Sequence, residues 1–194
     1  MTEGDRDLSA RMAFLMEADR LKSVTRATRL ADGSREENSA EHSWHLSLFA
    51  LTLAPHAPEG VDPSRVIAML ILHDLVEIDA GDTPIFGTAP DPTEAEARAA
   101  DRIFGLLPPA QANAFRALWN EFETAETADA RFAKSLDRFQ PPNLNLANGG
   151  GSWTDYDVTE DQVRARVGAK IEHGAPALWE WLSPRIAAFF RLGG

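Results

Sequence analysis

One apolar run with a histidine and an aspartate inside it constrains this chain most. Residues 66–78, VIAMLILHDLVEI, show no polar stripe, so a helix formed from them is expected to lie in the core. Burying an ionised carboxylate there is costly unless a cation or a dense hydrogen-bond shell compensates it. We therefore interpret His73 and Asp74 as residues placed for chemistry, and a buried divalent metal ion as the economical explanation.

Neighbouring residues extend this candidate metal site. His73 and Glu77 are four residues apart and Asp74 and Glu77 are three apart, so they share a helix face. His42, upstream, and Asp137, downstream, complete the set if the fold brings them close. Such a mixed nitrogen and oxygen set suits one divalent ion among Mn, Co, Mg, Zn and Fe. Two His and two Asp ligands leave positions open for water and substrate, as catalytic sites require.

Each of these residues also has an ordinary structural interpretation. A His-Asp pair on a helix, taken alone, is more often found without a metal ion. Asp137 could pair with Lys134 or Arg138, and Glu77 could be a carboxylate at a helix end. His45 is expected to be structural, because its segment lacks the His-Glu-x-x-His pattern of zinc proteases.

Composition limits the class of protein further. The 194 residues fit one domain with a sizeable core, and no domain boundary is visible, so we expect a single domain over 1–194. Cysteine is absent, which excludes disulfides and thiolate ligands. No apolar run approaches the roughly 20 residues that span a bilayer, and the N-terminus lacks a signal pattern. We therefore expect a cytoplasmic protein without a membrane partner.

The charge of the chain argues against a nucleic-acid partner. At a formal net charge of −11, the chain has too few cations to neutralise a polyanion. One basic cluster departs from this balance, and it could be a solvated helix end or a site that attracts a small anionic ligand. Its members are Arg20, Lys22, Arg26, Arg29 and Arg35.

The spacing of apolar residues is helical nearly throughout, and no strand alternation is visible, which predicts an all-α fold. Met12, Leu15, Met16 and Ala18 are expected to be available for burial in the first helix. The two prolines at 141–142 are expected to end a helix and to begin an irregular loop over 141–157. The expected helices span about 8–22, 39–54, 62–79, 91–104 (capped by Asp91), 108–122, 127–140 and, C-terminally, 158–192.

The order His42, His73-Asp74, Asp137 resembles the H…HD…D signature of the HD-domain metal-dependent phosphohydrolases. Residues 37–43, ENSAEHS, and 73–84, HDLVEIDAGDTP, are similar to the bacterial 5′-deoxynucleotidase and its eukaryotic HD-domain-containing relatives. Further matches carry the resemblance over about residues 10–140. The bare HD dipeptide is weak evidence, whereas the HD-x-x-E-x-x-x-x-D-x-P string with both outer ligands is specific.

The resemblance implies an all-α HD-type helical bundle and a role for each matching residue. The metal ligands would be His42, His73, Asp74 and Asp137. Glu77 would handle or position the attacking water, and Asp82, with Thr83, Pro84 and Ile85, would meet the sugar end of the substrate. Arg26 would contact the phosphate, with Arg29 as the fallback. In the bacterial enzyme a tryptophan follows this arginine and screens against a ribose 2′-hydroxyl, whereas Ala27 stands here.

The leading hypothesis is hydrolysis of a small phosphomonoester, a nucleoside or deoxynucleoside 5′-monophosphate. The alternative is an HD module that retains metal and binds a ligand or regulates without turnover. The presence of Glu77 and Asp82 favours the hydrolase, because a degenerate binding module has little need for them. Relatives are commonly dimers, and the last helix carries more aromatic surface than a small domain buries, unless core packing covers it. A homodimer is therefore expected. The aromatic residues of the last helix that suggest it are Trp179, Trp181, Phe189 and Phe190.

Overall fold

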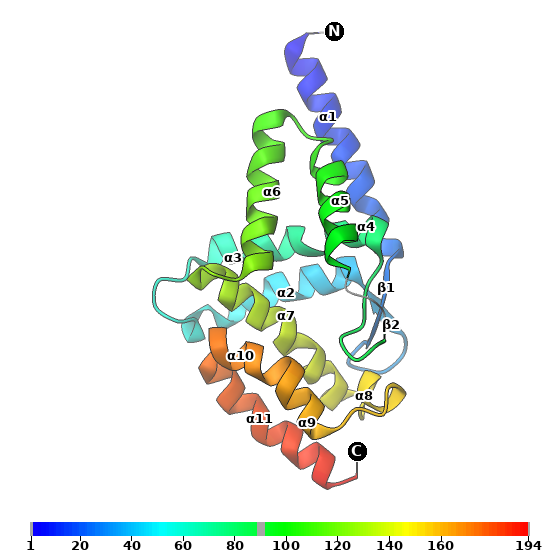
Figure 1. Ribbon diagram of the computed structural model, residues 1–194, viewed down its shortest axis with the longest axis vertical. Coiled ribbons are helices and arrows are strands. Elements are labelled where there is room, and N and C mark those ends of the chain that lie inside the picture. The colour runs from blue at the N-terminus through cyan, green and yellow to red at the C-terminus, as the bar shows by residue number, and fades with distance from the viewer. Residues whose placement is uncertain (1, 89–91, 194) are drawn as a thin grey trace.

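Helices cover most of the computed structural model, which describes residues 2–88 and 92–193, and the predicted all-α fold class is confirmed (Figure 1). Asp91, the expected cap of one helix, lies outside the described residues. The N-terminal elements are α1 Glu3–Ala18, the 3-10 helix η1 Asp19–Ser23, β1 Thr25–Arg29, β2 Glu36–Asn38, α2 Ser39–Leu53, η2 Ala54–His56, α3 Pro63–Leu72, η3 His73–Val76 and α4 Glu77–Ala80. The C-terminal elements are α5 Thr93–Phe104, α6 Pro109–Thr124, α7 Ala128–Ala147, α8 Ser152–Asp155, α9 Glu160–Val163, the π-helix η4 Arg164–Gly168, α10 Ala169–Gly174 and α11 Pro176–Arg191.

The helices gather into two groups on either side of α2 and α3. Figure 1 shows α1, α5 and α6 toward the N-terminal end, and α7, α10 and α11 toward the C-terminal end. Each group has a cluster of buried hydrophobic side chains, one including Leu46 and Leu136 and the other including Phe104 and Trp119. Leu118 of α6 packs against both clusters, so the two parts of the core meet there.

Capping residues set the starts of the two central helices. The Asn38 side chain accepts a hydrogen bond from Glu41 N, and the Glu41 carboxylate accepts one from Asn38 N, which forms a capping box for α2. Asp62 caps α3, and Pro63 takes its first helical position. The predicted starts of both helices are therefore confirmed, and the first places His42 close to the beginning of α2.

A short antiparallel hairpin follows η1, although no strand was expected. Strand β1 pairs with β2, with Arg29 opposite Glu36. Strands this short and this polar show no alternation of apolar and polar residues, so the pattern that predicts a strand is missing. The register between the strands is irregular between Thr25 and Arg29, the stretch of β1 that contains Arg26 and Thr28. Both residues line the cavity described below.

The loop predicted over 141–157 is wrong, because α7 continues through its two prolines to Ala147 and α8 follows. The prolines remove two backbone N–H donors. Burial of Pro142 offsets part of this cost, and Asn143 Nδ2 donates a further hydrogen bond to the carbonyl of Phe139 at 2.6 Å. The chain then reverses through three consecutive glycines with positive φ, a conformation that glycine adopts without strain: Gly149, Gly150 and Gly151.

Two expectations about apolar surface are also wrong. Helix α1 buries Phe14 but leaves Met12, Leu15 and Met16 exposed, because it projects beyond α5 and is covered on one side only (Figure 1). In α11 the alternative, core packing, is correct. Of its four aromatic residues, Trp181 alone has an exposed side chain, with 48% of its surface accessible. The other aromatic residues of α11 pack in or against the core cluster: Trp179, Phe189 and Phe190.

The contact between α10 and α7 depends on a glycine. A methyl group at Gly174 would overlap the backbone carbonyl of Arg131 and the hydroxyl of Ser135 in α7. We expect Gly174→Ala to lower the free energy of unfolding by about 1–3 kcal/mol, because the overlapped carbonyl belongs to a buried helix. The control is Gly4→Ala, where the added methyl meets nothing closer than 3.9 Å. Equal stabilities of the two variants in denaturant unfolding would contradict this packing.

Candidate metal centre and active-site cavity

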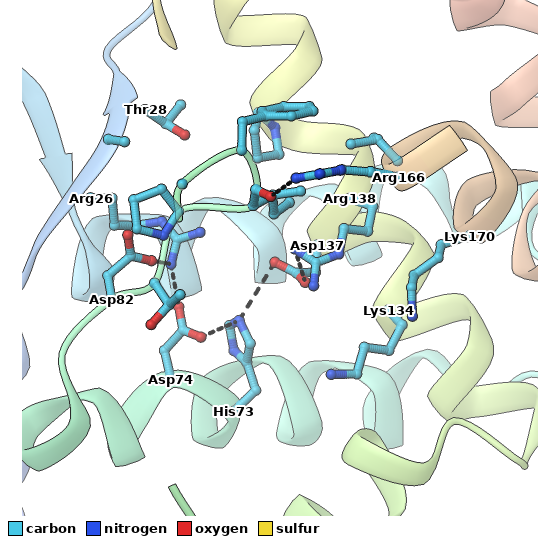
Figure 2. Close-up of a pocket in the computed structure, with 18 of the residues that line it drawn as sticks. Arg26, Thr28, His73, Asp74, Asp82, Lys134, Asp137, Arg138, Arg166 and Lys170 are labelled. Carbon is cyan, nitrogen blue, oxygen red and sulfur yellow. Dashed lines mark hydrogen bonds and ion pairs between the residues drawn. The ribbon is translucent and has the colours of Figure 1, made fainter. Parts of the chain in front are cut away.

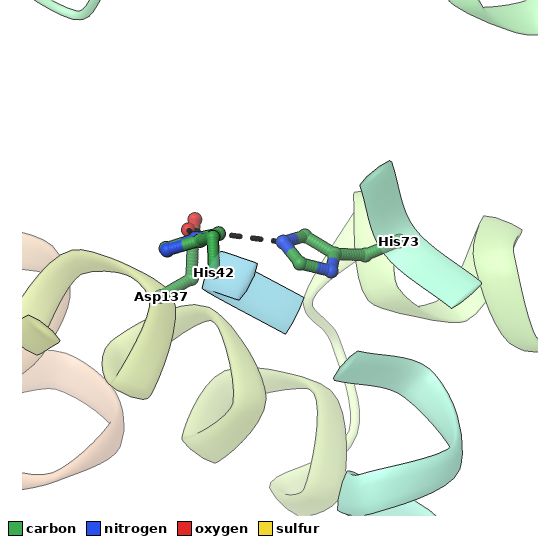
Figure 3. Close-up of side chains that lie close together, drawn as sticks. All are labelled: His42, His73 and Asp137. Carbon is green, nitrogen blue, oxygen red and sulfur yellow. Dashed lines mark hydrogen bonds and ion pairs between the residues drawn. The ribbon is translucent and has the colours of Figure 1, made fainter. Parts of the chain in front are cut away.

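Two imidazoles and a carboxylate from three separate elements meet in the interior (Figure 3). His42 comes from α2, His73 begins η3 and Asp137 lies in α7. Nε2 of His42 lies 3.1 Å from Oδ1 of Asp137, and Nε2 of His73 lies 3.9 Å from the same oxygen. All three residues are buried, and one ligand atom from each lies within 4.8 Å of the others. This cluster could hold a metal ion.

Asp74 lies beside the cluster. Its Oδ1 is 2.9 Å from Nε2 of His73, and its Oδ2 is 3.0 Å from Nη1 of Arg26. Ligand atoms about 3 Å apart are the separation expected for neighbouring positions around an ion with ligand distances near 2.1 Å. Among the described residues, Nε2 of His73 is buried and makes no hydrogen bond of suitable geometry, although it lies 2.9 Å from Asp74 Oδ1. A cation at this point would satisfy that orphaned nitrogen, so the donor set fits a metal ion.

Groups behind the cluster orient both imidazoles. Nδ1 of His73 lies 2.8 Å from the carbonyl oxygen of Leu70. Because a carbonyl only accepts, Nδ1 carries a hydrogen, and Nε2 is the ring nitrogen directed at Asp74 and the cluster. Nδ1 of His42 faces Oε1 of Glu37 at 3.4 Å, and Gln140 Nε2 donates to the other oxygen of Glu37 at 3.0 Å. Carboxylates in this position hold a metal-binding histidine in its ligating orientation.

Glu37 and Gln140 were not identified as site residues from the sequence. Glu37 belongs to the ENSAEHS segment that carries the family resemblance, and Gln140 follows Asp137 by three residues, one helical turn later. The available signals were therefore a motif position and a shared helix face. His45, expected to be structural, lies outside the cluster, with its Nδ1 3.3 Å from Gln140 Nε2.

The helix expected over 62–79 tightens into a 3-10 turn at His73–Val76. The carbonyl of His73 accepts a hydrogen bond from Trp119 Nε1 at 3.1 Å, from outside its own helix. Residues three apart align in a 3-10 turn, so Asp74 and Glu77 both point toward Arg26.

Arg26 is surrounded by carboxylates. Its Nη1 lies 3.0 Å from Asp74, 3.1 Å from Asp82 and 3.5 Å from Glu77. Burial disfavours a charged guanidinium, but these carboxylates together raise the pKa of Arg26 above its ordinary value. The side chain therefore stays cationic in the interior.

The hairpin places Arg26, and not the fallback Arg29, at the cavity where a phosphate contact was expected. Residues three apart in a strand point to opposite faces, although they share a face in a helix. Arg26 accordingly faces the cavity, whereas Arg29 pairs with Asp155 at 3.3 Å and does not line the cavity. The structure brings Arg26 to the site and leaves Arg29 outside it.

Three carboxylates surround the single guanidinium of Arg26, and the pKa values of these carboxyl groups reflect the excess of negative charge. Burial and the charge of Asp74 raise the pKa of Glu77 to about 10, and burial raises the pKa of Asp82. Burial also opposes ionisation of Asp74, but His73 and Arg26 outweigh it and lower the pKa of Asp74 to about 2. Because like charges this close cannot all ionise, an added cation would be favoured here.

These groups line one side of a cavity of about 970 Å³ (Figure 2). That volume lies at the upper end of the roughly 300–1,000 Å³ typical of small-molecule sites. Glu77 accepts a hydrogen bond from Ser39 Oγ at 2.5 Å and lines the cavity. Ala27 also lines it, as do the other residues expected from the sequence to meet substrate, apart from the fallback Arg29: Arg26, Asp82, Thr83, Pro84 and Ile85.

Comparison with known proteins assigns the family. The model of the HD domain matches residues 18–179, so this chain belongs to the HD domain family. A crystal structure of a predicted metal-dependent phosphohydrolase from Magnetospirillum magnetotacticum MS-1 is 47% identical, covers 97% of both chains and has a TM-score of 0.91. A conserved hypothetical protein from Pyrococcus furiosus, 21% identical with a TM-score of 0.55, shares the fold.

Curated relatives are more distant in sequence. Human 5′-deoxynucleotidase HDDC2 is 26% identical over 130 residues, which are 66% of this chain and 62% of that protein. The 5′-deoxynucleotidase hdd1 of Schizosaccharomyces pombe is 28% identical over 134 residues, covering 66% of each chain. The chain thus spans about three-fifths of the length of the human relative that it matches.

The contact between Glu37 and His42 can be tested by metal binding. We expect Glu37→Gln to weaken Mn²⁺ binding roughly 10- to 100-fold, because it removes the carboxylate that orients a ligating imidazole. The matched control is Glu36→Gln, an exposed position on the same strand, which should bind as the wild type does. Calorimetric titration of Mn²⁺ measures both, and equal affinities in the two variants would rule out this role for Glu37.

Proposed function

We propose that this chain is a metal-dependent phosphomonoester hydrolase. The observation that carries the proposal is the orphaned Nε2 of His73, which faces buried carboxylates beside a cavity that also contains Arg26. The names of the Magnetospirillum structure and of the human relative support the same activity. One divalent ion, Mn, Co, Mg, Zn or Fe, would be held by four ligands: His42, His73, Asp74 and Asp137.

Each proposed role follows from the chemistry of the residue. A bound divalent ion would polarise a phosphoryl oxygen and acidify a bound water. Arg26 presents a planar guanidinium to the cavity, a group that binds nonbridging phosphate oxygens through two hydrogen bonds. Ser39 holds one oxygen of Glu77, and Glu77 would accept or steer the proton of the attacking water. Asp82, 3.1 Å from Arg26, would bind a sugar hydroxyl or assist the leaving oxygen.

The proposed substrate is a nucleoside 5′-monophosphate. Asp82 and the 83–85 backbone lie against the cavity next to Arg26, where the sugar would follow the phosphate. Ala27 lines the same side and fills far less of it than the tryptophan described for the bacterial enzyme. We therefore propose that ribose is accepted as well as deoxyribose.

A ligand-binding module without turnover is the second candidate function. It needs the metal ligands but neither Glu77 nor Asp82. Both carboxylates line the cavity, and both lie within 3.5 Å of Nη1 of Arg26, where a phosphate would bind. Their position favours turnover over simple binding.

Phosphate release from a panel of ribo- and deoxyribonucleoside 5′-monophosphates with Mn²⁺, Co²⁺ or Mg²⁺ tests the proposal. We expect turnover by the wild type and a loss of about 10²–10⁴-fold in kcat for Glu77→Gln, because a general acid–base group is removed. The Mn²⁺ content of Glu77→Gln should stay unchanged, since Glu77 is not one of the proposed ligands.

Two further variants separate the outcomes. Asp74→Ala should lose both metal and activity while the fold persists, and a fully active Asp74→Ala enzyme would refute the ligand assignment. Asp79→Asn, on the same short helix α4 but paired with Arg102 away from the cavity, should keep the wild-type kcat. Metal binding without phosphate release from any nucleotide would favour the binding module.

The remaining expectations about partners and location stay predictions. Within residues 2–88 and 92–193, none of the helices combines the length and hydrophobicity that crossing a bilayer requires. We propose that residues 1–194 act as one domain on a small phosphorylated substrate rather than on a nucleic-acid polymer, whose backbone the net charge of −11 would repel. A cytoplasmic location is part of this proposal.

We also propose that the chain forms a homodimer, through surfaces other than the last helix. Two helices carry exposed apolar stripes with helical spacing, and uncovered apolar patches of this kind mark protein interfaces. The stripe on α1 contains Leu8, Met12, Leu15 and Met16, and the stripe on α2 contains Trp44, Leu48 and Leu51.

Sedimentation velocity at micromolar concentration tests the dimer. We expect a dimer for the wild type and a monomer for Met12→Glu/Met16→Glu, because burying two carboxylates in an apolar interface is costly. The control, Arg6→Glu, changes charge on the same helix outside the stripe. A monomeric wild type would disprove the homodimer.

A further inference from the structure

A second group of charged residues lines the side of the cavity opposite Arg26 and Asp82 (Figure 2). Helix α7 contributes Arg131, Lys134 and Arg138, spaced three and four residues apart along one face. The η4–α10 segment, which packs against α7, contributes Arg166 and Lys170, spaced four apart. We call this group the basic wall.

Repulsion between the cations of the basic wall lowers the stability of the fold. Like charges three or four residues apart on one helix destabilise it by roughly 0.2–0.5 kcal/mol per pair. The chain as a whole is strongly acidic, with a formal net charge of −11, so cations gathered on a cavity wall are not a general feature of its surface. The π-helix that carries Arg166 is a rare conformation that is frequently found at functional sites.

Few of these cations are matched by carboxylates. Lys134 pairs with Glu123 at 3.0 Å, while Arg138 reaches only Asp137, at 3.7 Å, and its buried Nε has no hydrogen-bond partner among the described residues. Lys170 Nζ is exposed on the cavity and has no ion-pair partner within the described part of the chain. The wall therefore retains unmatched positive charge that faces the cavity.

Two contacts connect the wall to the proposed reaction site. Arg166 Nη1 donates to the carbonyl of Ile85 at 2.9 Å, in the segment proposed to meet the sugar. The ring centroid of Phe122 lies 4.9 Å from that of His73 and 4.1 Å from Lys134 Nζ. The wall and the His73–Arg26 side line the same cavity, so a ligand bound at His73 and Arg26 lies in the cavity that the wall faces.

We propose that the basic wall binds a second phosphoryl group of the substrate, one that is not hydrolysed at the metal centre. This inference rests on the proposed function for the reacting phosphate. The second group could be attached across the sugar, as in a nucleoside 3′,5′-bisphosphate, or along the same chain, as in a nucleoside 5′-diphosphate. The 3′-phosphate of the bisphosphate is a dianionic monoester, whereas the inner phosphoryl of the diphosphate carries a single charge. Lys170 and Arg138 supply charge-assisted donors to the phosphoryl oxygens in either case.

Calorimetric binding to the Mn²⁺-loaded Glu77→Gln protein tests the wall without interference from turnover. The ligands are deoxyadenosine 5′-monophosphate, its 3′,5′-bisphosphate and its 5′-diphosphate. We expect one doubly phosphorylated ligand to bind at least tenfold more tightly than the monophosphate, and which one it is identifies where the second group is attached. When Lys170→Gln is added to the Glu77→Gln protein, the affinity for that doubly phosphorylated ligand should fall about tenfold, as expected for the loss of a charge-assisted hydrogen bond. Affinity for the monophosphate should change less than twofold.

Lys22→Gln is the matched control, because it removes one exposed lysine of η1 that pairs with Asp19 and does not line the cavity. It should leave all three affinities unchanged. Equal affinities for the three ligands, or an equal loss for all three in Lys170→Gln, would overturn the inference. Failure of the wild type to release phosphate from any nucleotide of the panel described above would instead refute the proposed function, and the binding result would still decide the role of the wall.

Discussion

The structure around the cavity depends on one electrostatic constraint, which is that several buried carboxylates share too little positive charge. Arg26 neutralises part of the excess, since Asp74, Asp82 and Glu77 all lie within 3.5 Å of its Nη1. The remainder keeps Glu77 protonated, with its pKa raised to about 10 by burial and by Asp74. A divalent ion beside His73 would neutralise the remaining negative charge of these carboxylates. Metal binding and the ionisation of the reactive carboxylates are therefore coupled in this site.

Local backbone features turn this constraint into a defined geometry. The capping box at Asn38 starts α2 so that His42 faces inward, and the 3-10 turn after Leu72 aligns Asp74 with Glu77. The hairpin sets the direction of Arg26. The hairpin strands carry mostly polar residues and serve the chemistry of the site, whereas the 3-10 turn also places Leu75 and Val76 in the hydrophobic core.

The fold class and the candidate ligands could be predicted because both leave strong local signals. A polar pair inside a continuous apolar run indicates a buried site, and the HD-x-x-E-x-x-x-x-D-x-P string names its members. The hairpin and the continuation of α7 through Pro141 could not be predicted, since each contradicts the propensity of its own residues and depends on tertiary contacts.

Contacts between distant segments were also out of reach of the sequence. Glu37 reaches the ring of His42 only because a strand and a helix meet at a cap, and Lys170 reaches the cavity only because α10 packs on α7. Met12 is apolar and helical in spacing, yet it is exposed, since no element of the described chain covers that face of α1. Periodicity shows which residues share a face, but not what covers it.

Anomalous diffraction from a crystal soaked in Mn²⁺ tests the central claim most directly. The predicted result is one strong peak about 2.1 Å from Nε2 of both histidines and from an oxygen of both aspartates, His42, His73, Asp74 and Asp137. An empty site in which His42 and Asp137 keep their direct contact, with manganese bound elsewhere or not at all, would contradict it.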